Sequence, residues 1–254
     1  MKNIIIITGA SSGIGQEFAL QIDTAFSNVD EIWLIARREE RLEELARVMD
    51  HTTRLIVMDL TDEYAMDDLE QLMEEEQICI RMLINAAGFG LMGCFEELSL
   101  EDQLDMLRLN CEALTRMTYL CLPYMKKGSR IIQLASSAAF LPQQDFAIYA
   151  ATKSYVLSFS RALNRELSAQ DIYVTAVCPG PVSTEFFTIA EQYGTTLDLK
   201  KHVMITAEKC VSEALRDSYH KKEVSVPGLI MKAFLLLTKT LPHSTILSFA
   251  QLLK

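Results

Sequence analysis

The fold of this chain is decided near its start, where residues 4–15 read Ile-Ile-Ile-Ile-Thr-Gly-Ala-Ser-Ser-Gly-Ile-Gly. Four apolar β-branched residues in a row predict a buried strand, and the glycines after them predict a tight turn that opens into a helix. Gly9 permits the turn, Gly13 lets a ligand approach the backbone, and Gly15 lets the helix pack on the strand. The free N–H groups at the start of that helix then face an anion.

The spacing of these glycines is G-x3-G-x-G, which differs from the G-x-G-x-x-G of the general dinucleotide fingerprint. No Lys-Ser or Lys-Thr pair follows the last glycine, so the stretch is not a phosphate-binding P-loop. A purely structural turn remains the alternative, and further motifs are needed to decide.

The rest of the chain alternates short β-rich runs with longer amphipathic runs, which is typical of a parallel sheet with helices on both faces. We therefore predict an α/β fold of the Rossmann type, with a doubly wound, mainly parallel, seven-stranded sheet, in a single domain over residues 1–254. Strands are expected at residues 3–8, 31–36, 54–58, 81–84, 130–135, 172–177 and 223–226. Helices are expected at residues 13–25, 38–50, 62–76, 100–126, 149–169 and 207–220.

Two segments depart from this alternation. Residues 181–206 form a long connection of the kind that covers a binding site, so we expect a substrate lid there. The tail, residues 229–254, is strongly apolar but is interrupted by Lys232, Lys239 and Pro242. Contact of the tail with a membrane surface is an alternative, since the two lysines would share one helix face, but the crude alternation does not favour it.

The composition narrows the function classes. The 254 residues carry a formal net charge of −10, which argues against a nucleic-acid partner because phosphate binding needs a basic surface. The six cysteines and four histidines show no metal-ligand spacing, so no metal site is expected. The cysteines are typical of reduced thiols, and neither a secretory signal nor a run of about 18 apolar residues is found, so we expect a cytoplasmic location.

A second informative stretch is Tyr149-Ala-Ala-Thr-Lys153, with Ser136 upstream of it. On the expected helix, Tyr149 and Lys153 stand four residues apart, so both side chains leave the same face. A nearby ammonium, together with an oxidised nicotinamide ring, would lower the pKa of the phenol from about 10 to about 7. Such a phenol is a general acid or base for reducing ketones or oxidising alcohols. The pair alone is weak support, because Tyr and Lys share helix faces by chance in most proteins.

Further motifs accompany these two stretches. In chain order the set is Thr8-Gly9-x3-Gly13-Ile14-Gly15, Asp59, Asn85-Ala86-Ala87-Gly88, Asn110, Ser136, Tyr149-x3-Lys153 and Pro179-Gly180-Pro181-Val182-Ser183-Thr184. Together they resemble the short-chain dehydrogenase/reductase family. The resemblance implies an oxidoreductase that transfers a hydride between a nicotinamide cofactor and a carbonyl or alcohol group.

The resemblance also implies how the motifs surround the cofactor. Asp59 would approach the adenine, and residues 85–88 would border the adenosine ribose and support the central sheet, with strand-end capping as the alternative role of Asn85. Residues 179–184 would wrap the nicotinamide carboxamide through Val182 and Thr184. The expected cofactor-binding residues are Gly9, Ser11, Ser12, Gly13, Ile14, Gly15, Arg37, Arg38, Asp59, Asn85, Ala86, Ala87, Gly88, Tyr149, Lys153, Pro179, Gly180, Val182 and Thr184.

Four residues are implied in catalysis: Asn110, Ser136, Tyr149 and Lys153. Tyr149 would give a proton to the carbonyl oxygen, Ser136 would hydrogen-bond the same oxygen, and Lys153 would lower the pKa of Tyr149. Asn110 would bend its helix and present its backbone carbonyl to a water that reaches Lys153. Ser137 is the alternative to Ser136, but the family's thirteen-residue gap to the tyrosine selects Ser136.

The end of the second expected strand bears on the choice of dinucleotide. An NAD-selective site places a carboxylate there, but this strand ends Leu-Ile-Ala-Arg-Arg at residues 34–38. Guanidinium groups match a 2′-phosphate in charge and geometry. We therefore expect NADP(H) rather than NAD(H), with Ser11 and Arg37 as the leading contacts and Arg38 next. Two surface arginines at a helix start are the simpler alternative.

The substrate is less well defined. Five apolar side chains would line the substrate cleft and favour a lipophilic carbonyl or alcohol compound: Phe89, Leu91, Phe140, Phe146 and Phe186. Simple packing near a lid is the alternative. The tail resembles that of family members that reduce long acyl chains and steroids, where it covers the active site or packs on another subunit. The resemblance also implies a homodimer or homotetramer, paired through the helices near 100–126 and 149–169.

A second hypothesis is a dinucleotide-binding regulator or scaffold that keeps the fold without the chemistry. The presence of the Tyr, Lys and Ser residues favours the enzyme. A sugar-nucleotide epimerase shares YxxxK but would need a longer chain and a different glycine spacing.

Overall fold

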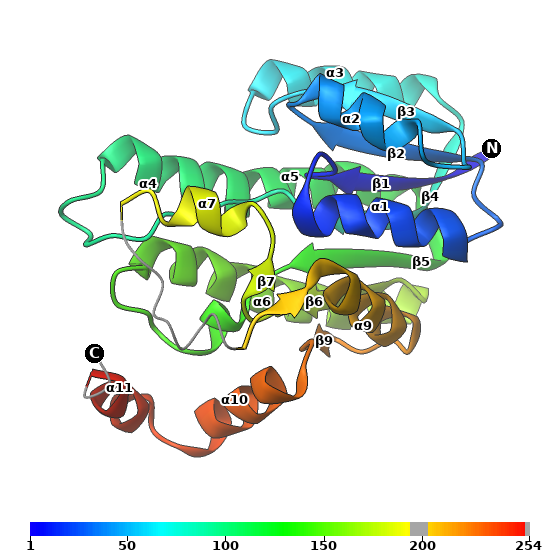
Figure 1. Cartoon of the computed structure of the whole chain (residues 1–254). Coiled ribbons are helices and arrows are strands. Elements are labelled where there is room, and N and C mark those ends of the chain that lie inside the picture. Colours follow the sequence, from blue (N-terminus) through cyan, green and yellow to red (C-terminus); the bar gives the residue numbers. More distant parts are fainter. Residues whose placement is uncertain (194–202, 252–254) are drawn as a thin grey trace.

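The computed structural model describes residues 1–193 and 203–251, and it confirms the Rossmann-type α/β fold. Seven parallel strands form one sheet in the order β3-β2-β1-β4-β5-β6-β9, with helices on both faces (Figure 1). The chain first adds β2 and β3 on one side of β1 and then crosses to add β4 on the other side. Ligands of such sheets bind at the carboxyl ends of the strands, beside this reversal of direction.

The strands follow the apolar runs of the sequence. They are β1 (Lys2–Thr8), β2 (Glu31–Ala36), β3 (Thr53–Val57), β4 (Ile78–Asn85), β5 (Met125–Leu134), β6 (Tyr173–Val177) and β9 (Val224–Ser225). All seven expected strands are present. The expected bounds were too short for β4 and β5, both of which begin earlier.

Most helices also lie where the sequence predicts them. They are α1 (Gly13–Ala25), α2 (Glu39–Ala46), α3 (Glu63–Glu75), α6 (Ala147–Leu167) and α9 (Ala207–Tyr219). The helix expected over 100–126 is not one continuous α-helix. It consists of α4 (Leu100–Leu107), a π-helical turn (Arg108–Ala113) and α5 (Leu114–Cys121). It ends in a 3-10 turn that contains Pro123, because proline cannot continue an α-helix.

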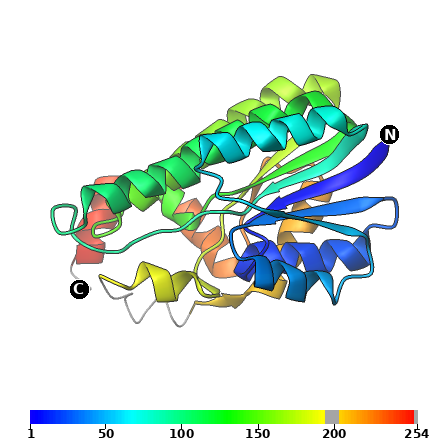
Figure 2. The ribbon, with the colours of Figure 1, turned by 90° about the horizontal axis from the view of Figure 1, so that it is seen from above.

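Side chains of β1 are buried on both faces of the sheet. Ile4 and Ile6 pack with α3 and α5, whereas Ile5 and Ile7 pack with α1, α2 and α9. Figure 2 shows this division, with the cyan and green helices on one face and the blue and orange helices on the other. Burial on both faces explains why this strand has no polar alternation.

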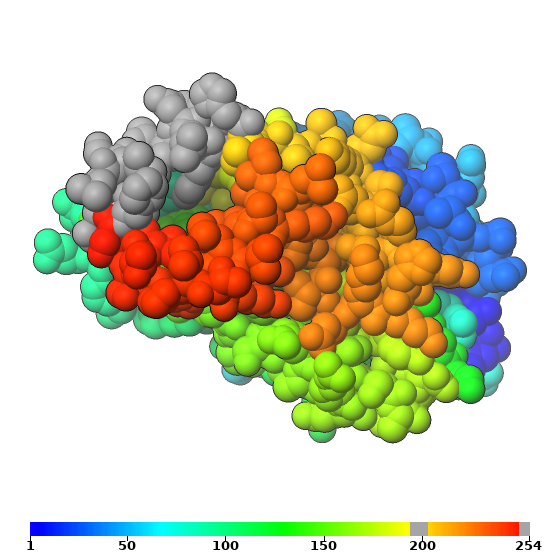
Figure 3. Space-filling model, turned by 90° about the horizontal axis from the view of Figure 1, so that it is seen from below, coloured from blue at the N-terminus to red at the C-terminus, as the bar shows by residue number. Residues whose placement is uncertain are grey.

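The two irregular segments contain short elements of their own. The lid region holds β7 (Val182–Ser183), α7 (Phe186–Ala190) and β8 (Ile205–Thr206), and the tail holds α10 (Leu229–Thr240) and α11 (His243–Gln251). Residues 194–202 of the expected lid and 252–254 of the expected tail lie outside the described residues. Figure 3 shows α10 and α11, in orange and red, on the surface of the molecule. Within the described ranges, no helix is long and apolar enough to cross a membrane.

Candidate active site

A cleft of about 650 Å³ lies at the carboxyl edge of the sheet. Its walls include residues that directly follow five strands, namely Gly9 after β1, Arg37 after β2, Met58 after β3, Ala86 after β4 and Ala135 after β5. The residues predicted for the cofactor and for catalysis all line this cleft, except Asn85 and Asn110. The fold therefore brings together motifs that lie far apart in the sequence.

The glycine turn between β1 and α1 forms a cradle with little room for side chains. Gly9 has a φ of +67°, and a Cβ there would stand 2.8 Å from the backbone of Ala87. A Cβ on Gly15 would collide with the carbonyl of Gly9. Ser12 precedes α1, but its hydroxyl accepts from Arg38 and does not cap the helix. The first N–H groups of α1 thus remain suited to an anion, which fits the pyrophosphate of a dinucleotide.

Arg38 forms the centre of a polar cluster at one end of the cleft. Its Nη2 donates to Ser12 Oγ at 2.7 Å and to Ser11 Oγ at 3.2 Å, and its Nη1 pairs with Glu185 Oε2 at 3.0 Å. The sequence ranked Arg37 ahead of Arg38, but Arg37 pairs with Asp59 at 3.4 Å. Asp59 lies shortly after β3, the strand next to β2. Because Arg37 pairs with Asp59, its guanidinium is not among the partners of Ser11 and Ser12.

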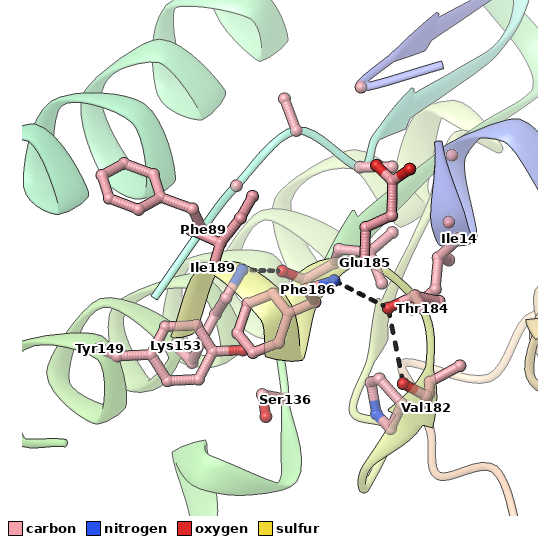
Figure 4. A pocket seen from close by; sticks show the side chains of 18 of the residues that line it. Ile14, Phe89, Ser136, Tyr149, Lys153, Val182, Thr184, Glu185, Phe186 and Ile189 are labelled. Carbon is pink, nitrogen blue, oxygen red and sulfur yellow. Dashed lines mark hydrogen bonds between the residues drawn. The ribbon is translucent and has the colours of Figure 1, made fainter. Parts of the chain in front are cut away.

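Tyr149 and Lys153 lie one turn apart on α6 and are both almost fully buried. The ring of Tyr149 stacks on Phe146 with 4.2 Å between the ring centroids. Lys153 Nζ lies 5.6 Å from the centroid of the Tyr149 ring and donates to the carbonyl of Leu134 at 2.8 Å. Figure 4 shows the two side chains next to each other, with Ser136 below the phenol.

The expected lowering of the Tyr149 pKa requires an oxidised nicotinamide ring in addition to Lys153, and the protein groups alone act in the opposite direction. Burial raises the pKa of Tyr149 to about 12, and a hydrogen bond with Ser136 opposes that rise. Burial also lowers the pKa of Lys153 to about 8, opposed by the thiols of Cys111 and Cys178. Both groups are removed from water, which disfavours the charged form of each. A more acidic phenol therefore needs a further positive charge in the cleft.

Ser136 and Ser137 have different surroundings although both line the cleft. Ser136 lies beside the Tyr149 phenol, and its Oγ accepts from the N–H of Ala138 at 3.1 Å. The backbone N–H of Ser137 donates to the carbonyl of Pro179 at 2.8 Å. The hydrogen bond with Tyr149 favours Ser136 as the residue that acts with the phenol.

Asn110 is fully buried within the π-helical turn. Its Oδ1 accepts from the N–H of Phe89 at 3.1 Å, and its Nδ2 donates to the carbonyl of Phe89 at 2.8 Å and to Thr152 Oγ1 at 3.1 Å. The expected irregularity of this helix is present. Its side chain holds the loop after β4 against α6, which makes Asn110 a positioning residue in this geometry.

Asn85 does not line the cleft, contrary to one part of the prediction, but it supports the central sheet, in agreement with the other part. Its Nδ2 donates to Thr118 Oγ1 at 3.1 Å and to Gln133 Oε1 at 3.0 Å, so the amide joins β4 to α5 and β5. The reason is its position as the last residue of β4, where it is buried inside the molecule. The border of the cleft is formed by residues 86–88 instead.

A family model for short chain dehydrogenases matches residues 3–193 of this sequence. The chain belongs to the short-chain dehydrogenase/reductase family. Sulfoacetaldehyde reductase 2 of Chromohalobacter salexigens is 33% identical over 73% of this chain and 75% of the relative. The 11-beta-hydroxysteroid dehydrogenase-like 3 protein of Arabidopsis thaliana is 32% identical over 85% of this chain and 70% of the relative.

Solved structures agree with this membership. The short-chain dehydrogenase of Sphingobium yanoikuyae in complex with NADPH superposes with a TM-score of 0.78, at 28% sequence identity, covering 94% of this chain and 96% of that chain. The names of the two relatives above refer to very different substrates, so family membership leaves the substrate open.

The apolar wall of the cleft in this short-chain dehydrogenase differs in part from the prediction. Phe89, Phe146 and Phe186 line the cleft as expected. Leu91 instead packs in a buried cluster below it, and Phe140 is buried with its ring centroid 6.4 Å from that of Phe234.

Several lining residues were not predicted from the sequence. Ile230, Met231 and Phe234 of α10 form part of the wall, and Glu185 stands at its polar end. The apolar character of the tail was visible in the sequence, but its register against the cleft was not. One sequence feature could have indicated the place of Glu185 in the cleft, namely that it directly follows the Pro179–Thr184 motif.

Proposed function

We propose that this protein is an NADP(H)-dependent oxidoreductase that transfers a hydride between the nicotinamide and a carbonyl or alcohol group of a small lipophilic substrate. One observation carries the proposal: Tyr149, Lys153 and Ser136 meet in the same cleft as the glycine turn of residues 9–15. An acid/base group, a hydrogen-bond donor for an oxyanion and an anion cradle are the parts that this reaction requires.

A bound nicotinamide would supply or accept the hydride. In the direction of reduction, Tyr149 gives its proton to the substrate oxygen, and Ser136 donates a hydrogen bond to the same oxygen. Lys153 places a positive charge near the phenol and supports its ionised form. Asn110 keeps Phe89 and Thr152 in place around these groups.

The preference for NADP(H) is supported by the cluster around Arg38. The guanidinium, with Ser11 and Ser12, offers donors for a 2′-phosphate, and β2 ends in Ala36 rather than in a carboxylate. The relative from Sphingobium yanoikuyae, seen in complex with NADPH, adds support.

A lipophilic substrate is supported by the apolar side chains of the cleft. Phe89, Phe146 and Phe186 pack in one cluster with Tyr149, and Met231 and Phe234 line the same cleft. Burial of apolar substrate surface against such side chains stabilises the complex by about 25 cal/mol per Å².

We also propose a homodimer or homotetramer that pairs through α4, α5 and α6. Tyr119 of α5 and Tyr155 of α6 are 76% and 43% exposed, which is unusual for large rings on neighbouring helices. A reducing, cytoplasmic location belongs to the same proposal, since all six cysteines are free.

The test is a panel of aldehydes and ketones, from polar to lipophilic, offered to the purified protein with NADPH while NADPH absorbance is recorded. Tyr149→Phe should lower turnover about a hundred- to ten-thousandfold with little change in NADPH affinity. Tyr64→Phe is the matched control, because it removes the hydroxyl of an exposed tyrosine on α3 and should leave turnover unchanged. Tight NADPH binding without turnover of any compound would favour the regulator or scaffold.

A further inference from the structure

Glu185 bridges the two sides of the cleft at its polar end. It stands between Thr184 and α7, and its Oε2 pairs with Arg38 Nη1 at 3.0 Å while its Oε1 pairs with Arg41 Nη2 at 3.2 Å. Figure 4 shows its carboxylate directed away from Tyr149 and Lys153. Arg38 and Arg41 belong to the segment after β2, so the bridge joins residues that are 147 positions apart for Arg38 and 144 for Arg41.

The guanidinium of Arg38 binds both the two serine hydroxyls and the carboxylate of Glu185. Arg38 contacts Ser11 and Ser12 with one part of its donor set and Glu185 with another. A guanidinium has five N–H donors in a fixed planar arrangement. A phosphate that binds beside Ser11 brings a second negative group to this guanidinium and so competes with Glu185 for the positive charge of Arg38. The pair is nearly half exposed on both sides, so it is weak enough to exchange.

We infer that Glu185 is a specificity-determining residue: it occupies Arg38 in the free protein and must give up this arginine when the 2′-phosphate of NADP(H) binds. The inference rests on the proposed function and deepens it, because it names what opposes the phosphate. NAD(H) carries a hydroxyl at that position and leaves the Glu185–Arg38 pair intact. Arg41 retains Glu185 after the exchange, since it is already the second partner.

Glu185 also connects the phosphate end of the cleft to the substrate end. Its backbone carbonyl accepts from the N–H of Thr188 at 3.1 Å and of Ile189 at 3.4 Å, so it anchors the first turn of α7. Phe186, the next residue, lies with its ring centroid 5.5 Å from that of Tyr149. When Glu185 gives up Arg38, Arg41 is its remaining ion-pair partner, so the helix that carries part of the substrate wall is held by one ion pair in place of two.

The first test compares the affinities of NADPH and NADH, measured by calorimetry. Glu185→Gln should lower the Kd of NADPH about two- to fivefold and leave that of NADH unchanged, and high salt should reduce the gain. Glu44→Gln is the matched control, because Glu44 is an exposed carboxylate of α2 without an ion pair in the described part of the chain. An unchanged NADH-to-NADPH ratio, or weaker NADPH binding, overturns the inference.

The second test measures hydrogen exchange of the α7 amides, residues 186–190, and does not depend on turnover. Adenosine 2′,5′-bisphosphate should speed exchange there in the wild type, whereas adenosine 5′-monophosphate should not. In Glu185→Gln the exchange should already be fast and should not respond. Equal responses to both nucleotides overturn the inference.

The two proposals fail in different ways. A wild-type protein that binds neither dinucleotide overturns the proposed function and this inference together. If the protein binds both dinucleotides and reduces ketones, but Glu185→Gln leaves the ratio of the NADH and NADPH Kd values unchanged, only the inference is overturned.

Discussion

Lys153 Nζ lies 5.6 Å from the centroid of the Tyr149 ring, yet its ammonium donates to the carbonyl of Leu134. The lysine is thus held by the end of β5 and not by the phenol. The acidity of Tyr149 then depends on what enters the cleft, since burial alone raises its pKa to about 12. Lys153 thus holds a positive charge near the phenol. Tyr149 keeps its proton at neutral pH unless a second positive charge binds in the cleft.

Burial of Lys153 should reduce the stability of the folded protein at neutral pH. Its folded pKa of about 8 is below the ordinary value of 10.5, so the unfolded chain binds a proton that the folded chain lacks between these values. The free energy of unfolding therefore increases as the pH rises from 8 to 10.5, because this burial penalty disappears. Lys153→Met should raise the free energy of unfolding by about 1–3 kcal/mol at pH 7 while turnover is lost.

Urea unfolding of both proteins at neutral and alkaline pH checks this. The advantage of Lys153→Met should shrink as the pH rises from 8 through 10.5, above which the wild-type lysine is neutral in both states. A difference between the two proteins that does not change with pH would contradict the assignment.

Ser136 and Ser137 form a matched pair on one loop. Ser136→Ala should lower turnover about a hundred- to a thousandfold, because it removes a hydrogen bond to the developing oxyanion. Ser137→Ala should have little effect, since its described hydrogen bond uses the backbone N–H. Steady-state kinetics with one ketone decide the matter, and the reverse order of effects would make Ser137 the active residue.

Arg38 and Arg37 are adjacent but differently placed. Arg38→Gln should raise the Kd of NADPH about ten- to a hundredfold and leave that of NADH nearly unchanged, because a charge-assisted contact with the 2′-phosphate is lost. Arg37→Gln should have a smaller effect, since this side chain is 73% exposed and pairs with Asp59. Titration of both cofactors measures this, and a larger effect at Arg37 would restore the order expected from the sequence.

The wall contributed by α10 should select for lipophilic substrates. Phe234 lines the cleft, whereas Leu236 of the same helix is 64% exposed. Phe234→Ala should lower kcat/KM for a lipophilic ketone about tenfold relative to a short polar one, because apolar contact is lost. Leu236→Ala should leave that ratio unchanged. Similar effects of both substitutions would mean that α10 acts only through overall stability.

Features that depend on neighbours along the chain could be predicted from the sequence. The glycine turn, the alternation of strands and helices, and the spacing of Tyr149 and Lys153 are local patterns with local physical causes. Pro123 likewise marked the end of the fourth helix, although the predicted helix ran past it. The π-helical turn around Asn110 is less local, because its side chain bonds to Phe89 and Thr152.

By itself the sequence determined the family, the strand–turn–helix cradle and most of the cofactor-binding motifs that line the cleft, because these follow from contiguous motifs and a known chain order. Only the tertiary structure decided that Arg38 rather than Arg37 reaches the serines, that Glu185 crosses to the arginines, and that α10 closes the apolar wall. Each of these depends on which side chains meet after folding, and the burial of Tyr149 and Lys153 likewise results from the packing of the whole molecule.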